Sequence, residues 1–322
     1  MKSYAEFFNL YRSRLLPALY NLEPARKDAL FALLTSVFFI LIAAGGFLLF
    51  SRSGKAAGLA IALPPLVFGI YSLYRYSRKK SAYAEAFKEQ VIREMVALID
   101  PGLHYFPQRH IAQSDYRQAD IFRASIDRFH GDDLVEGTLG ATYCRFSELH
   151  HQEKRESTDS KGRRRTHWVT VFKGLFFVAD FNKHLHGRTY IVPDAGTSLL
   201  GIGKLFEKWR FDKGELVELE NPEFEKLFTV YGTDQVEARY ILSPSMMERL
   251  VGFRRRANTR LHLSFIGSNL YLAIALNKNL FEPNLFSSGV KSGYLKDYFR
   301  YLDLVTGLVE DLNLNLRIWG KT

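Results

Sequence analysis

The stretch VFKGLFFVADFNKHLHGRTYIVPD, Val171 to Asp194, joins a long apolar run to a turn and then to a shorter apolar run. Aromatic and β-branched residues, which favour strands, fill its first half. Asp180 begins an Asp-Phe-Asn-Lys sequence, and Asp and Asn favour turn geometry. The stretch therefore predicts a central strand over residues 171–181, a turn, and a second strand in GRTYIVPD.

Strand-forming composition extends to both sides of this stretch. The segments GDDLVEGTLGATYCRFSELHHQ (131–152) and THWVTVFKGLFFVADF (166–181) enclose QEKRESTDSKGRRRT (152–166), which has no apolar residue. This order predicts a hairpin with a long basic tip. RLHLSFIG and NLYLAIAL predict another hairpin around Gly267-Ser268.

Helix signals are interspersed with the strands. Asn221-Pro222 and Ser243-Pro244 each place a capping side chain before a proline, the residue favoured at the first helical position. Residues 81–99 and 294–312 carry apolar side chains at helical spacing. The soluble part is therefore predicted to be α+β, with mainly antiparallel strands and flanking helices. GDDLVE (131–136) resembles GTDQVE (232–237), which leaves open either an internal duplication or chance similarity.

Two uncharged apolar runs precede this part of the chain. ALFALLTSVFFILIAAGGFLLF (29–50) and AAGLAIALPPLVFGIYSLY (56–74) are separated by only SRSGK. At 1.5 Å per residue, each is long enough to cross about 30 Å of hydrocarbon. Pro64-Pro65 would break a soluble helix but is tolerated in a membrane helix. The runs predict a transmembrane hairpin in preference to a buried core hairpin or a cleaved signal peptide.

Basic residues flank the two spans unevenly. Several lie before the first span or after the second, and the connecting turn holds only Arg52 and Lys55. By the positive-inside rule, both termini are predicted to be cytoplasmic, in a multi-pass membrane protein. The expected organisation is a cytoplasmic amphipathic segment (1–28), a transmembrane hairpin (29–80) and a cytosolic α+β domain (81–322).

Composition narrows the classes of site and partner. Cys144 is the single cysteine, which excludes an intrachain disulfide and a cysteine-based zinc site. The formal net charge of +10 points to an anionic partner. Nucleic acid, phospholipid headgroups and acidic proteins all meet that description.

Several of these segments together resemble a known family. They are GDDLVEGTLGATYCRFSELH, VFKGLFFVADFNKHLHGRTYIVPD, FTVYGTDQVEARYILSPSMMERL and the late strand in FIGSNLYLAI. The chain resembles the bacterial domain of unknown function 3137, a family of uncharacterised proteins with an N-terminal membrane hairpin. The resemblance implies the architecture and a place at the cytoplasmic face of the inner membrane. It implies no activity and no catalytic residues.

Histidines are the first candidates for chemistry. If residues 149–151 pair with residues 166–168, three imidazoles meet near the basic tip, and a transition metal becomes reasonable there. The alternative is a set of exposed or hydrogen-bonded histidines at strand ends. The metal-ligand candidates are His150, His151, His167, His184, His186 and Asp180.

Carboxylates and known motifs add no assigned site. Asp132, Asp133 and Glu136, or Glu148 with Glu153, would suit acid–base chemistry, but loop capping and salt bridges with nearby arginines are the favoured interpretation. The glycines of residues 196–204 lack the spacing of a P-loop or a dinucleotide fingerprint. No catalytic residue is assigned and no cofactor is expected.

Two basic clusters remain as candidates for lipid or partner binding. They comprise Lys154, Arg155, Lys161, Arg163, Arg164 and Arg165, and then Arg254, Arg255, Arg256 and Arg260. Solvated surfaces without a partner are the alternative, and the absence of interleaved aromatics disfavours nucleic acid. The leading hypothesis is a membrane-anchored scaffold or binding module for a protein or anionic-lipid partner. The alternative is an enzyme at the cytoplasmic membrane surface, such as a metal-dependent hydrolase.

Overall fold

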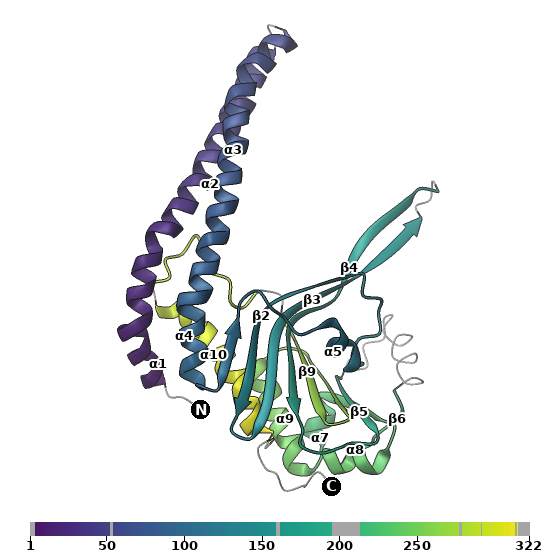
Figure 1. The fold of residues 1–322 in the computed structure, drawn as a ribbon. Coiled ribbons are helices and arrows are strands. Elements are labelled where there is room, and N and C mark those ends of the chain that lie inside the picture. The colour runs from purple at the N-terminus through teal and green to yellow at the C-terminus, as the bar shows by residue number, and fades with distance from the viewer. Residues whose placement is uncertain are drawn as a thin grey trace. The chain divides into compact units, whose positions relative to one another are not determined.

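The computed structural model describes residues 4–51, 54–158, 162–194, 213–276, 279–290, 292–312 and 314. Contacts divide the chain into two units. The helical unit contains Lys2–Leu98 and Phe281–Phe299, and the sheet unit contains Ile99–Leu280 and Arg300–Thr322. Figure 1 shows their elements, and each unit is described by itself.

The helical unit contains two long apolar helices. The first begins as α1 (Tyr4–Leu10), passes a π-helical turn and continues as α2 (Leu16–Phe50). The second begins as α3 (Lys55–Phe87), passes another π-helical turn and ends as α4 (Arg93–Ile99). Both are long and apolar enough to cross a membrane, and their most apolar windows are mostly exposed. The predicted helix over residues 81–99 is the end of the second one.

Small residues and hydroxyl groups bring α2 and α3 together. Ser36 Oγ donates to the Gly69 carbonyl and Ser72 Oγ to the Ala32 carbonyl, both at 2.8 Å. A Cβ on Gly69 would lie 2.9 Å from the Ile40 side chain, so the helices touch at this glycine. The same substitution at Gly45 of α2 would meet no atom within 4 Å, so that glycine is not a point of contact.

Residues 281–299 complete the helical unit by packing on the ends of these helices. The side chain of Arg26, largely buried, donates to the Leu285 carbonyl at 2.5 Å and pairs with Glu23 at 2.6 Å. Lys88 forms an ion pair with Glu282 at 2.8 Å. The rings of Phe7 and Phe299 lie 4.8 Å apart.

The sheet unit is built on a nine-stranded sheet with the order β1-β2-β3-β4-β9-β8-β5-β7-β6. Every neighbouring pair is antiparallel. The strands are β1 (Leu103–Phe106), β2 (Arg128–Leu139), β3 (Thr142–Thr158), β4 (Arg164–Asp180), β5 (Arg188–Pro193), β6 (Glu215–Leu216), β7 (Phe228–Gly232), β8 (Leu261–Ile266) and β9 (Asn269–Ala275). The predicted α+β class, the central strand and both hairpins are confirmed.

Helices flank this sheet. They are α5 (Gln113–Gln118), α7 (Pro222–Glu225), α8 (Gln235–Ile241), α9 (Pro244–Ala257) and the part of α10 (Ser292–Asp311) that begins at Arg300. The predicted caps are confirmed, because Asn221 accepts from two main-chain amides and Ser243 from that of Met246. Helix α8, which begins after the capping side chain of Asp234, was not predicted.

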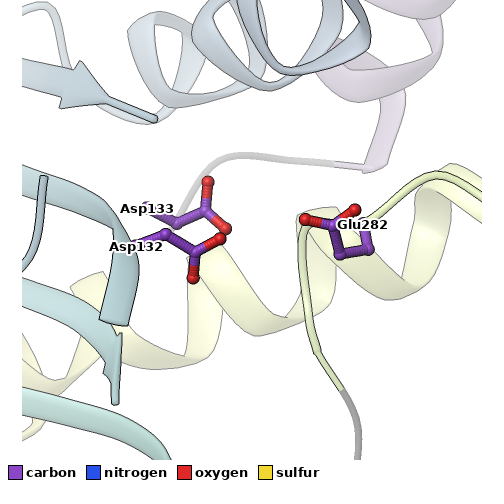
Figure 2. A group of neighbouring side chains, drawn as sticks. All are labelled: Asp132, Asp133 and Glu282. Atoms are coloured by element: carbon purple, nitrogen blue, oxygen red, sulfur yellow. The ribbon is translucent and has the colours of Figure 1, made fainter. Parts of the chain in front are cut away.

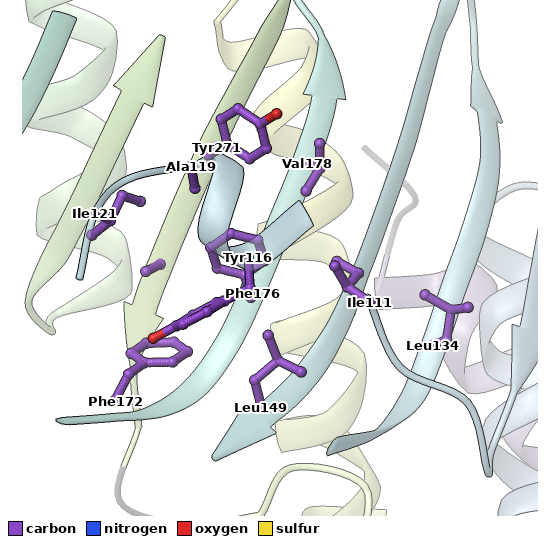
Figure 3. Packing of buried hydrophobic residues seen from close by; sticks show 11 residues of the cluster. Ile111, Tyr116, Ala119, Ile121, Leu134, Leu149, Phe172, Phe176, Val178 and Tyr271 are labelled. Atoms are coloured by element: carbon purple, nitrogen blue, oxygen red, sulfur yellow. The ribbon is translucent and has the colours of Figure 1, made fainter. Parts of the chain in front are cut away.

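The main core of the sheet unit lies between α5 and one face of the sheet. Tyr116 of α5 projects toward Phe172 and Phe176 of β4, as Figure 3 shows, and Leu149 of β3 belongs to the same cluster. All four side chains are at most 3% exposed. Apolar burial of this kind is the main stabilising contribution to a fold, at about 25 cal/mol per Å².

The two similar hexapeptides of the possible duplication lie in different elements. Gly131–Glu136 lies within strand β2, whereas Gly232 ends β7 and Gln235–Glu237 belongs to α8. The two similar sequences therefore form different local structures.

Candidate functional site

A cleft in the sheet unit crosses β2, β3 and β4. Its volume is about 320 Å³. The residues that line it are His130, Gly131, Asp132, Glu148, Leu149, His150, Lys173, Gly174 and Asn279. Five of these nine lining residues have titratable side chains.

Strand register places these side chains together. His130 lies opposite His150, and Asp132 lies opposite Glu148. Lys173 lies opposite His150 on its other side. Because alternate residues of a strand share a face, the two histidines and the two carboxylates form a square on one face of the sheet.

Neighbouring groups orient two members of the square. Glu148 is only 8% exposed, and its Oε1 accepts from the Leu280 amide at 2.6 Å. His150 Nε2 lies 3.1 Å from Thr170 Oγ1. Burial, followed by the charge of Lys173, lowers the pKa of His150, so its imidazole is neutral at pH 7.

A bulge in β2 separates the neighbouring carboxylates Asp132 and Asp133. The register shifts between Asp132 and Val135, and Asp133 has a φ of 59°. Tyr105 donates its hydroxyl to the buried Asp133 carboxylate, and burial raises the pKa of this tyrosine. Figure 2 shows both aspartates, with Glu282 as the third labelled residue. Glu282 belongs to the helical unit, so no site is assigned to the three.

The predicted metal ligands are spread over several places. His151 faces away from His150; it is fully buried, 3.0 Å from the Tyr116 hydroxyl and 2.9 Å from the Ser125 carbonyl. His167 is exposed and lies opposite Arg155. The predicted pairing of residues 149–151 with residues 166–168 is wrong, because His150 pairs with Lys173 and the strands are longer than that pairing assumed.

The loop after β4 contains the other candidates. The rings of His184 and His186 are exposed and lie 5.5 Å apart. Asp180 Oδ1 accepts from the Asn182 amide at 2.8 Å, so this carboxylate closes the predicted turn. Among the described candidates, only His184 and His186 come together.

His130 and Lys173 were not predicted as site residues. A signal for the square was present, because His130-x-Asp132 and Glu148-x-His150 each place two ligand types on one face of a strand. Folding the chain back about Gly140 brings these two patterns into register. The position of that turn decides which residues of the two strands meet.

The predicted basic tip forms an arm. We define the arm as residues 153–158, at the end of β3, together with residues 162–169, which contain the start of β4. Pairing of β3 with β2 stops at Gln152, and pairing of β4 with β9 stops at Gly174. The arm therefore extends beyond the rest of the sheet, as Figure 1 shows. Lys154 pairs with Glu156, and Arg155 with Glu153. Arg163, Arg164 and Arg165 are exposed, and Lys161 lies outside the described residues.

The second basic cluster has a local explanation. Arg254, Arg255 and Arg256 occupy the last turn of α9, where positive charge interacts favourably with the helix dipole. Arg255 also pairs with Glu223 at 3.1 Å. Arg260, just beyond the helix, is exposed. The glycine-containing segment 196–204 lies outside the described residues.

Comparison with known proteins gives a family-model match over part of the chain and no activity. Residues 170–314 match the family model described as "Protein of unknown function (DUF3137)". No curated protein matches the chain. A similar solved structure is that of the mycobacterial trehalose monomycolate transport factor A, TtfA, with 9% identity and a TM-score of 0.34. The similarity covers 68% of this chain and 93% of that one.

Proposed function

We propose that this chain, which belongs to the DUF3137 family by its residues 170–314, is a membrane-anchored binding module. In this proposal α2 and α3 cross the inner membrane and both termini are cytoplasmic. The arm of the sheet unit binds anionic lipid headgroups. The observation that carries the proposal is the extension of the arm beyond all neighbouring strands with its basic side chains exposed.

The composition of the arm supports a headgroup ligand. Residues 153–168 contain six Lys and Arg against three Asp and Glu. Each basic residue near an anionic leaflet contributes about 1 kcal/mol. Trp168 is 37% exposed, and tryptophan is enriched at membrane interfaces. Arg128 lies over its ring at 3.5 Å, which adds a cation beside the indole.

The lone cysteine makes a direct test practical. Cys144 is buried, and burial raises the pKa of its thiol to about 12, so thiol dyes will leave it unmodified. A polarity-sensitive dye on Ser157→Cys would report on the arm of the full-length protein. We expect its emission to shift to the blue, and acrylamide quenching to fall, in nanodiscs containing phosphatidylglycerol compared with phosphatidylcholine alone. High salt should reverse both changes by screening.

Matched charge reversals locate the contact. The triple variant Arg163→Glu, Arg164→Glu and Arg165→Glu should abolish the response. The triple variant Arg255→Glu, Arg256→Glu and Arg260→Glu makes the same change in net charge and should retain it. Equal dye behaviour in neutral and anionic nanodiscs would refute lipid binding. Shielding that occurs only in native membranes would instead indicate a protein partner.

Topology requires a separate measurement. A reporter that works only in the cytoplasm can be fused after Thr322. It should be active if both termini lie in the cytoplasm. Activity on the opposite side of the membrane would overturn the proposed orientation while leaving lipid binding by the arm to be decided by the dye experiment.

A further inference from the structure

We propose that His130, Asp132, Glu148 and His150 bind one divalent transition-metal ion, of the class of Zn²⁺ or Mn²⁺, in the cleft across β2 and β3. Metal binding here is independent of the proposed lipid binding, because none of the four residues belongs to the arm. The site also differs from the metal candidates that the sequence suggested, of which only His150 is retained.

The donor set and its placement are the first support. Two imidazoles and two carboxylates are ligand types that suit zinc and manganese. Directly opposed side chains in an antiparallel pair have Cβ atoms about 4.5–5.5 Å apart. Successive residues on one face of a strand are about 7 Å apart, at about 3.4 Å per residue. The registers His130–His150 and Asp132–Glu148 therefore make the four residues neighbours on one face of the sheet.

The charge pattern is the second support. Like charges directly opposite each other destabilise a sheet, and Asp132 lies opposite Glu148. Glu148 is 8% exposed, so solvent screens its charge poorly. The lining of the cleft also contains the ammonium group of Lys173. A cation relieves this repulsion, whereas an anion such as phosphate would increase it.

The neighbouring contacts are the third support, because ligands in metal sites are oriented by partners behind them. The Thr170 hydroxyl lies within hydrogen-bond distance of Nε2 of His150. In the proposed site, the other ring nitrogen, Nδ1, therefore binds the metal. The Leu280 amide holds Oε1 of Glu148 and so orients this carboxylate. No three of these four described residues have ligand atoms within 4.8 Å of one another, so binding requires side-chain rotation.

The test uses the full-length protein in detergent, treated with a chelator and then titrated with Zn²⁺ alone by calorimetry. We expect one ion per chain. Co²⁺ in place of Zn²⁺ should give the visible absorption of a site with nitrogen and oxygen ligands. His130→Ala, His150→Ala and Asp132→Asn should each weaken binding about tenfold or more. Far-ultraviolet circular dichroism of each variant shows whether it is folded.

Two control variants make the outcome decisive. His167→Ala removes an exposed histidine of the arm and should leave binding unchanged. The double variant His184→Ala and His186→Ala removes the adjacent histidine pair in the loop after β4 and should also leave it unchanged. Absence of stoichiometric binding would overturn the proposal. Binding that survives His130→Ala and His150→Ala but is lost in the loop variant would assign the metal to the loop instead.

Discussion

The ammonium group of Lys213 donates a hydrogen bond of 3.1 Å to the main-chain oxygen of Ile121, although the two residues are 92 positions apart. Lys213 also donates to the main-chain oxygen of Asp120 and lies 4.2 Å from the centre of the Tyr190 ring. Only 1% of this lysine is exposed. It therefore holds the segment after α5 against β5.

The pKa of Lys213 predicts how stability depends on pH. Burial lowers this pKa to about 7, whereas an unfolded lysine titrates at about 10.4. Between these values the unfolded chain binds the extra proton, so the free energy of unfolding should rise from about pH 7 to about pH 10. Below pH 7 both states are protonated and the cost of burying the charge is present in full.

Thermal unfolding of the full-length protein in detergent at pH 7, 8, 9 and 10 tests this. Lys213→Met should flatten the rise of the unfolding midpoint with pH. Lys226→Met removes an exposed lysine and should preserve this rise. Parallel profiles for the wild type and Lys213→Met would show that Lys213 does not titrate in this range.

The contact between His151 and Tyr116 predicts a structural role for this histidine. His151→Ala leaves the Tyr116 hydroxyl without its partner at 3.0 Å in the core and creates a cavity. An unpaired buried polar group costs about 1–3 kcal/mol. We therefore expect His151→Ala to lower the free energy of unfolding, measured with urea, by at least that amount. A double-mutant cycle with Tyr116→Phe should give a coupling energy well above zero, and additive losses would contradict a direct interaction. Zinc binding should be unaffected.

Gly69 predicts where the helical hairpin is sensitive to side-chain size. Gly69→Leu forces its side chain against Ile40, 2.9 Å from the Cβ position, and should separate α2 from α3. Gly45→Leu is the matched control, because nothing lies within 4 Å of that position. Midpoints of thermal unfolding in detergent should fall by several degrees for the first variant only. Equal tolerance of both changes would argue against close packing at Gly69.

The buried contacts of Arg26 should stabilise the packing of residues 281–299 on the helical hairpin. Arg26→Met removes the hydrogen bond to Leu285 and leaves Glu23, itself mostly buried, without its cationic partner. Removing one member of a buried pair costs about 3–5 kcal/mol. Hydrogen exchange of residues 283–290 should accelerate. The control variant Arg93→Met breaks an exposed ion pair with Glu89, which is worth about 0–1 kcal/mol. In this variant, hydrogen exchange of residues 283–290 should stay close to that of the wild type.

Local features of this protein could be predicted from its amino-acid order. The two apolar runs, the caps at Asn221 and Ser243, and the strand on either side of Gly267-Ser268 depend on neighbouring residues, so composition and spacing suffice to predict them. The turn at Asp180 was predictable for the same reason, because its carboxylate bonds an amide two residues away. The position of the basic arm followed from a polar segment between two strand-forming runs.

Which side chains meet depends on the fold of the whole chain. A shift of one residue in strand register moves every side chain to the other face, and the sequence does not state the register. That is why His150 faces the cleft beside His130 while its neighbour His151 is buried against Tyr116. The contact of Gly69 with Ile40 and the bond from Lys213 to Ile121 likewise join residues far apart in the chain. Such contacts arise from packing of whole elements, and no local pattern encodes them.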